Sequence, residues 1–167
     1  MLFILESSSI RYLLDELPRS VLPELWEYFE FECDNGDIIS DRETQKEAEI
    51  ELTNSDSLDW IEKHKSIFHT LTQKESIILG DMMQKGFFKS YENDPRLIER
   101  KLPEGIPFAL SMAKSRNATI VYRKSGKDTK LVIEICRQAR INSIEVEDML
   151  LKLKRDFKLA QRQKSET

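Results

Sequence analysis

The sequence predicts a three-layer α/β/α domain, in which helices cover both faces of a mainly parallel sheet of about four strands. Helical segments separate nearly all successive strand-like segments, and parallel strands require such crossover connections. Tight hairpin turns are not indicated, because the one Asn-Gly dipeptide, Asn35-Gly36, lies between a predicted helix and a predicted strand. The 167 residues, 40% of them hydrophobic, suffice for one core. We expect a single domain at 1–160 and a disordered tail at 161–167.

Four segments have the composition of strands. Residues 2–8 form an apolar run that ends in serines, as is typical of a central parallel strand, and the other three segments are 37–40, 118–122 and 144–146. Glu6 interrupts the first run and no basic residue precedes it, so it does not resemble a secretory signal. No apolar run approaches the ~20 residues of a membrane span. We therefore expect a cytoplasmic protein that does not enter the membrane.

The helices are predicted from apolar residues at helical spacing and from signals at their ends. Pro18 ends the first helix, and Pro23 begins the second. Capping boxes at Ser40/Glu43 and Thr72/Glu75 open two more. The predicted helices are 10–17, 23–34, 41–52, 56–65, 73–87, 108–115, 131–139 and 149–159, and residues 89–105 are expected to form an irregular connection.

Charge is distributed unevenly along the chain, whose net charge is −4. Residues 24–62 contain fourteen acidic and two basic residues, whereas residues 114–164 contain fourteen basic and six acidic residues. This asymmetry fits a cation site in one half and a polyanion-binding surface in the other, and it fits solvated helix faces equally well. Cys33 and Cys136 are far apart in sequence, and we expect two buried reduced thiols rather than a disulfide or a zinc site.

Ligands of parallel α/β sheets collect at the carboxyl ends of the strands, here near residues 6–8, 40–41 and 122–124. The sequence has no glycine-rich phosphate loop, GxSxG elbow or HExxH motif, which disfavours nucleotide-cofactor enzymes and common hydrolases. Glu6 follows a buried strand, where a carboxylate requires a hydrogen-bond partner, a proton or a cation. Glu47 lies on a predicted helix among other glutamates, and its spacing alone does not distinguish it from them.

The segment LESSSI resembles the first motif of PIN domains, an acid followed by small polar residues, with Glu6 in place of the usual Asp. The stretches LPELWEYFEFECDNGDIISDRETQKEAEIEL and SLDWIEKHKSIF resemble a VapC-like, PIN-like bacterial branch of unknown function, whose motif Glu falls on Glu47. The segment PFALSMAKSRNATIVYRKSG and the later VIEICRQARINSIEVEDMLLKL resemble the helix–strand–helix–strand–helix ending of that branch. The resemblance implies a PIN-like fold and a metal-dependent ribonuclease, as in toxins of toxin–antitoxin systems.

The chain departs from this family at two acid positions. The third PIN acid falls on Ile106, and the aligned residues for the fourth are Tyr122, Arg123 and Lys124. Glu104 and Asp128 are near enough in sequence to substitute, but no motif assigns them these roles.

The missing acids make the predicted active site degenerate. Fewer carboxylates attract Mg²⁺ or Mn²⁺ less strongly. Arg123 or Lys124 could pair with Glu6 and Glu47 in place of the metal ion, which would keep the fold and forfeit hydrolysis.

Two functions therefore remain open. In the first, the protein is a Mg²⁺- or Mn²⁺-dependent endoribonuclease toxin, in which Glu6 and Glu47 hold the metal ion and Ser8 assists catalysis. In the second, it is a catalytically inactive PIN-like scaffold that binds RNA or a protein partner such as a cognate antitoxin. PIN-type proteins often dimerise, so a homodimer is also expected. The candidate RNA contacts are Arg123, Lys124, Arg137 and Arg140.

Overall fold

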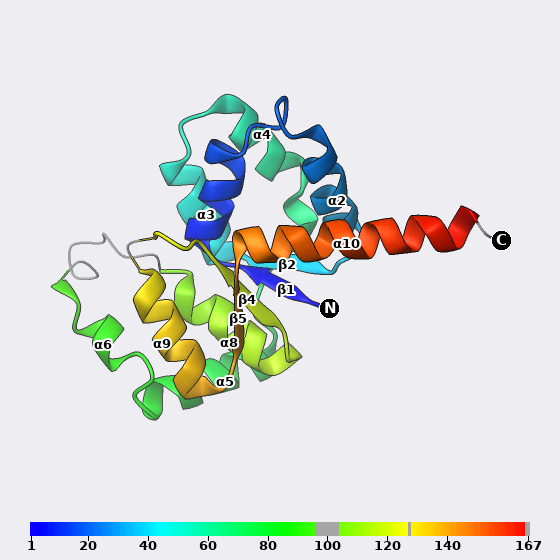
Figure 1. The fold of residues 1–167 in the computed structure, drawn as a ribbon. Helices are drawn as coiled ribbons and strands as arrows, with labels where there is room; N and C mark the ends of the chain where they lie inside the picture. Colours follow the sequence, from blue (N-terminus) through cyan, green and yellow to red (C-terminus); the bar gives the residue numbers. More distant parts are fainter. Residues whose placement is uncertain (96–103, 127, 166–167) are drawn as a thin grey trace.

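A computed structural model describes residues 1–95, 104–126 and 128–165. In these residues one sheet has the strand order β3-β2-β1-β4-β5, and every pair of neighbouring strands is parallel (Figure 1). The predicted α/β class with a parallel central sheet is confirmed. The strands are β1 (Phe3–Leu5), β2 (Ile38–Asp41), β3 (Phe68–His69), β4 (Thr119–Tyr122) and β5 (Asn142–Glu145).

The sheet has five strands where we predicted about four, and β3 is the strand that the prediction missed. It consists of Phe68 and His69 only, which pair with Ser40 and Asp41 of β2. Two residues are too few to show the alternation or the apolar run by which a strand is recognised in a sequence. The last strand was predicted at residues 144–146, but β5 covers Asn142–Glu145 and Val146 already begins α10.

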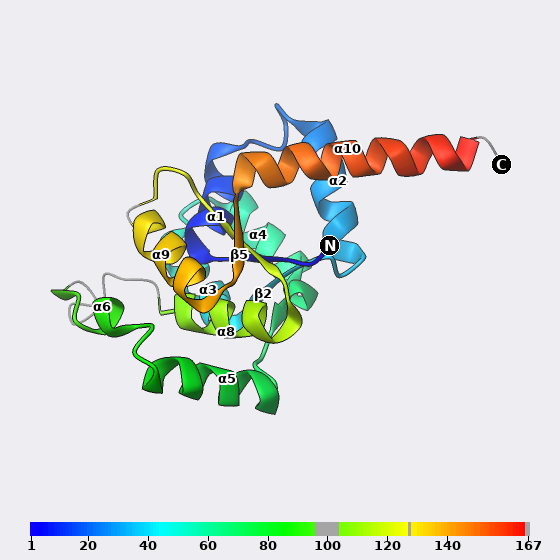
Figure 2. The same ribbon diagram turned by 60° about the horizontal axis from the view of Figure 1, so that its bottom comes forward.

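Helices cover both faces of the sheet (Figures 1 and 2). One face packs against helices α1, α2, α4 and α10, and the other packs against α8 and α9, with α5 lying outside α8. The helices are α1 (Ser7–Arg11), which continues as a π-helix over Tyr12–Glu16, α2 (Pro23–Asp34), α3 (Arg42–Glu51), α4 (Ser55–Lys63), α5 (Gln73–Gln84), α6 (Lys89–Glu92), α8 (Ile106–Arg116), α9 (Thr129–Ala139) and α10 (Val146–Ser165), with a 3₁₀ turn at Lys65–Ile67.

Strand β1 lies at the centre of the sheet and contributes to both hydrophobic cores. Phe3 and Leu5 belong to the core beneath α1, α2 and α10, whereas Ile4 belongs to the core beneath α8 and α9. Successive side chains of a strand point to opposite faces, so a strand covered on both faces must be apolar at every position. This explains why residues 3–5 form an uninterrupted apolar run. The two cysteines are buried and unpaired, as predicted.

The start of α3 differs from the prediction, because Asp41 rather than Ser40 is its N-cap. The Asp41 carboxylate accepts hydrogen bonds from the backbone amides of Glu43 and Thr44, at 3.0 and 2.9 Å. The Ser40 hydroxyl instead donates to the carbonyl oxygen of Leu5 at 2.7 Å, which joins β2 to β1. Asp and Ser are almost equally good N-caps, so the sequence did not distinguish these adjacent residues.

The capping box predicted at the start of α5 is confirmed. The Glu75 amide donates to the Thr72 hydroxyl at 3.3 Å, and the Glu75 carboxylate accepts from the Thr72 amide at 2.7 Å. We expect Thr72→Ala to lower the free energy of unfolding by about 1 kcal/mol, because the substitution leaves the Glu75 amide without its cap. Thr72→Ser keeps the hydroxyl and should retain most of that stability. Urea denaturation of the two variants tests this, and equal losses would contradict it.

Two segments differ from the prediction in their backbone. The expected irregular connection at 89–105 contains the short helix α6, and its residues 96–103 lie outside the part that the structure describes. The tail that we expected from residue 161 continues α10 as helix through Ser165, and α10 extends well beyond the sheet (Figure 1). Within the described residues, no helix is both long enough and apolar enough to cross a lipid bilayer.

Candidate functional site

The candidate site lies at the carboxyl edge of the sheet, where the two central strands end in acidic residues. Glu6 directly follows β1, and Asp41 is the last residue of β2. Parallel strands end at the same edge, so both carboxylates lie on the side of the sheet where α/β proteins bind ligands. Each is also the N-cap of the following helix, and both are almost completely buried.

Glu6 is 2% exposed and holds the start of α1. Its carboxylate accepts hydrogen bonds from the backbone amides of Ser8 and Ser9, at 3.0 and 2.9 Å, and from the Ser8 hydroxyl. Burial raises the pKa of Glu6 despite these bonds, and the nearby negative charge of Asp128 raises that pKa further. The structure therefore places Ser8, the residue expected to assist catalysis, in contact with Glu6, and the visible role of this contact is to cap α1.

Glu47 projects from α3 toward the N-terminus of α8. One carboxylate oxygen accepts from the Gly105 amide at 2.8 Å. The other oxygen is buried without a hydrogen-bond partner among the described residues. Burial raises the pKa of Glu47 to about 8, and the charge of Asp41 adds to this effect. The hydroxyl of Ser7 lies near enough to lower that pKa somewhat, although it does not form a hydrogen bond of normal geometry.

Asp41 is a buried acid of this edge to which the sequence assigned no chemical role. It is 1% exposed, and burial raises its pKa to about 6. Its second carboxylate oxygen accepts from the Thr44 hydroxyl at 2.8 Å. The only signal in the sequence was its place at the end of a strand, and its interaction with Glu47 depends on the three-dimensional arrangement.

The position of the third family acid is part of the hydrophobic core. Ile106 is 1% exposed and packs in the cluster that contains Ile4 and Ile39 of the two central strands. Its neighbour Gly105 approaches α3 so closely that an added Cβ would lie 2.4 Å from the Thr44 hydroxyl oxygen. An ionised carboxylate at position 106 would be buried in apolar surroundings, at a large cost in free energy. Glu104, one of the considered substitutes, is exposed just before α8.

The cations at the fourth position form ion pairs with other acids, which corrects the pairing with Glu6 and Glu47 that the sequence suggested. Arg123 forms an ion pair with Glu16 at 2.7 Å, and its guanidinium lies 5.1 Å from the ring centre of Tyr12. Lys124 forms an ion pair with Glu145 at 3.4 Å. Glu16 and Glu145 can form these ion pairs because Glu16 ends the π-helix after α1 and Glu145 ends β5, and both lie near the carboxyl end of β4. Asp128, the other considered substitute, is the N-cap of α9, and its negative charge raises the pKa of Glu6.

In the part of the chain that the structure describes, the acids of this edge are not arranged as ligands for Mg²⁺ or Mn²⁺. Among the described residues, no group of three or more His, Cys, Asp or Glu side chains is arranged to hold a metal ion. Both oxygens of Glu6 and both oxygens of Asp41 accept hydrogen bonds from their own helices. These divalent ions require several oxygen ligands directed at one point, which the bonded carboxylates do not offer.

The four candidate RNA contacts do not form one surface. Arg123 and Lys124 follow the carboxyl end of β4, whereas Arg137 and the C-cap residue Arg140 lie at the far end of α9. A crossover helix returns the chain to the opposite edge of a parallel sheet, so α9 separates the two pairs by its own length. Arg137 and Arg140 are exposed, and neither makes an ion pair with another described residue.

A family model described as "Domain of unknown function (DUF4411)" matches residues 3–157. Among solved structures, a chain from the crystal structure of VapBC2 from Rickettsia felis, bound to a DNA fragment from their promoter, is similar with a TM-score of 0.54. The two chains are 13% identical over 87% of this chain and 98% of that chain. No curated protein matches the sequence. At this level of identity the likeness concerns the fold alone.

Proposed function

We propose that this chain, which belongs to the DUF4411 family and has a PIN-like fold, is a binding scaffold that does not hydrolyse RNA with a divalent metal ion. The observation that carries the proposal is that the Glu6 carboxylate caps the N-terminus of α1. Its two oxygens accept two backbone amides and one hydroxyl, all within the first turn of α1. A carboxylate committed in this way is a poor ligand for Mg²⁺ or Mn²⁺, because binding the ion would break the cap.

The other acids of the edge support the same proposal. The third family position is the core residue Ile106, and Glu47 holds the N-terminus of α8 through the Gly105 amide. The raised pKa of Glu47, about 8, means that this side chain retains its proton at neutral pH, and a protonated carboxyl is a weak metal ligand. Each acid therefore has a structural task that favours the scaffold over the nuclease.

A protein is the partner that the surface favours. An apolar groove of about 630 Å³ lies between residues 17–25, α2 and α10. Two of its apolar residues are largely uncovered, with Val21 70% exposed and Leu151 67% exposed. The similar Rickettsia felis chain comes from an assembly with another protein, and by analogy the groove would hold a partner chain. RNA is less favoured, because the candidate basic residues lie at opposite edges of the sheet.

Calorimetric titration with Mn²⁺ tests the proposal, together with an RNA cleavage assay in the same buffer. We expect no saturable binding up to about 1 mM Mn²⁺, where even a weak site would be half filled, and no cleavage. Saturable binding that Glu6→Gln abolishes would contradict the proposal. Asp81→Asn is the matched control, because Asp81 is an exposed acid of α5 that pairs with Lys85.

A further inference from the structure

The apolar groove between residues 17–25, α2 and α10 contains a carboxylate for which the described chain supplies no cation. Of the twelve described residues that line the groove, nine are apolar or aromatic, and the charged ones are Glu24, Glu147 and Lys154. Val21 on one rim and Leu151 on the other are largely exposed. Covering such surface with apolar groups of another molecule is favourable. The few charges of the groove therefore decide which molecule can cover it.

Two of these charges already have partners. Glu24 accepts a hydrogen bond from the Tyr28 hydroxyl, and its carboxylate lies 3.8 Å from the Lys154 ammonium and 3.6 Å from the Lys158 ammonium. Glu24 and Lys154 therefore offset each other, and neither selects an occupant by its charge.

Glu147, in the first turn of α10, is the charge without a counterpart. Its side chain is half-buried, and its Oε2 atom is buried without a hydrogen-bond partner among the described residues. No described Lys or Arg forms an ion pair with it. The Tyr12 hydroxyl lies beside this carboxylate, because burial raises the pKa of Tyr12 and the interaction with Glu147 raises it further. Since Glu147 is only half-buried and lines the groove, a cation that enters the groove can reach its carboxylate.

We propose that the groove binds a segment of a partner protein in which apolar side chains flank one Lys or Arg, and that this cation pairs with Glu147. The inference rests on the binding function proposed above and specifies the chemistry of the partner. An occupant with apolar groups alone would complete the burial of the Glu147 carboxylate without replacing its water, and that desolvation opposes binding. An acidic occupant would add repulsion. A cation between apolar side chains avoids both penalties.

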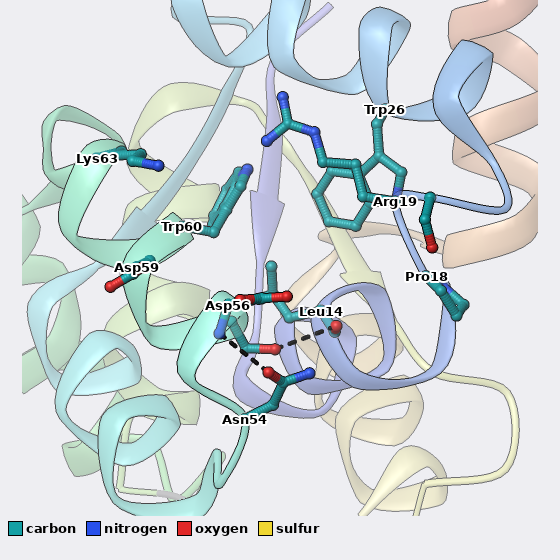
Figure 3. Close-up of a pocket in the computed structure, with 11 residues that line it drawn as sticks. Leu14, Pro18, Arg19, Trp26, Asn54, Asp56, Asp59, Trp60 and Lys63 are labelled. Atoms are coloured by element: carbon teal, nitrogen blue, oxygen red, sulfur yellow. Dashed lines mark hydrogen bonds between the residues drawn. The ribbon is translucent and has the colours of Figure 1, made fainter.

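A second pocket of the molecule shows no such selection. It has a volume of about 300 Å³ and lies between the end of the π-helix, α2 and α4 (Figure 3). Acids and cations both line it, among them Asp56, Asp59 and Lys63, and its Arg19 already forms an ion pair with Glu30 at 2.7 Å. These charges favour a ligand of neither sign. Selection for a cation is therefore a property of the apolar groove.

The test uses three capped tripeptides that differ in one side chain, Ac-Leu-Lys-Leu-NH₂, Ac-Leu-Gln-Leu-NH₂ and Ac-Leu-Glu-Leu-NH₂. NMR of the methyl groups of the full chain reports where they bind, because Val21 and Leu151 carry methyl groups on the two rims. We expect the Lys peptide to shift these signals with a dissociation constant of about 1 mM, and the Gln peptide to bind about tenfold more weakly. The Glu peptide should bind more weakly still. Equal binding of the Lys and Gln peptides, or no shift up to about 10 mM, would overturn the proposal.

A substitution at Glu147 separates the charge from the apolar contacts. Glu147→Gln should weaken binding of the Lys peptide about tenfold, to the level of the Gln peptide, and leave the Gln peptide unchanged. Asp148→Asn is the matched control, because Asp148 is the next residue of α10, is exposed and does not line the groove. A preference for lysine that survives Glu147→Gln, or that disappears in Asp148→Asn, would contradict the assignment of Glu147.

A substitution on the rim tests the place of binding. Leu151→Ser should weaken all three peptides to the same degree, because Leu151 provides apolar surface and no charge. Leu151 is exposed, so the variant should fold, which circular dichroism verifies. Unchanged binding would place the peptides elsewhere and overturn the proposal.

Two further measurements distinguish a partner protein from other occupants. n-Hexylamine has a cation and an apolar chain but no peptide groups, and it should bind about tenfold more weakly than the Lys peptide. Equal affinity would assign the groove to a small amine and overturn the proposal. Sedimentation of the protein alone that shows a dimer, which the Lys peptide dissociates, would assign the groove to a second copy and also overturn it. Failure of these tests would leave the Mn²⁺ result, and with it the non-hydrolytic scaffold, unaffected.

Discussion

Gly105→Ala is expected to lower the free energy of unfolding by about 3 kcal/mol. The added Cβ would lie 2.8 Å from the backbone nitrogen and 3.0 Å from the Cα of Thr44, besides its contact with the side chain. Rotation of a side chain cannot relieve contacts with backbone atoms, so α8 would have to move away from α3. That movement would also stretch the 2.8 Å hydrogen bond from the Gly105 amide to Glu47.

Gly80→Ala provides the matched control, because a Cβ at this position in α5 would meet no atom within 4 Å. Alanine is the better helix former, so this variant should gain about 0.5–1 kcal/mol. Denaturation in guanidinium chloride, followed by circular dichroism, measures both changes. Gly105→Ala with the stability of the wild type would show that α3 and α8 do not approach each other as described.

Glu47→Gln is expected to stabilise the protein at alkaline pH by about 2 kcal/mol and to have little effect near pH 5. Burial raises the pKa of Glu47 from 4.5 to about 8 in the folded protein. Between these values the unfolded chain releases the proton and the folded chain keeps it, so the stability of the wild type falls as the pH rises. Glutamine carries no titrating proton. We expect only part of the full shift as free energy, because the side chain is partly exposed to screening solvent.

The measurement is the free energy of unfolding at several pH values between about pH 5 and pH 9. Asp41, whose pKa is raised to about 6, and Glu6 should leave a weaker slope of the same sign in the variant. Glu49→Gln is the matched control on the same helix, because Glu49 is exposed and accepts a hydrogen bond from Gln45. A wild-type stability that increases toward pH 9 would contradict the protonated, buried Glu47.

Much of the fold could be predicted because the elements carry independent local signals. Pro23 and Asn35 mark the two ends of α2, and Thr72 with Glu75 marks the start of α5. The elements that failed lacked such signals. The strand β3 has two residues, and its pairing with Ser40 and Asp41 is determined by the neighbouring strand rather than by its own composition.

The candidate site was less predictable because its chemistry depends on which groups meet in space. The sequence correctly selected Glu6 as a buried acid at the end of a strand. It could not indicate that Glu16 would pair with Arg123, or that Gly105 would donate to Glu47, because each partner is distant along the chain. The family resemblance located the missing acids, and only the packing of Ile106 explains why an acid there is unfavourable.

The central position of β1 has a consequence for how the chain folds as it is synthesised. Phe3 pairs with Ile38 on one side and with Thr119 on the other, so the second neighbour of β1 is made long after the first. Until β4 has left the ribosome, the nascent chain carries an apolar strand with an open edge, which is the kind of segment that recruits chaperones or aggregates. Contacts between such distant segments also slow folding. Truncations that end before β4 should therefore be recovered as insoluble material rather than as folded subdomains.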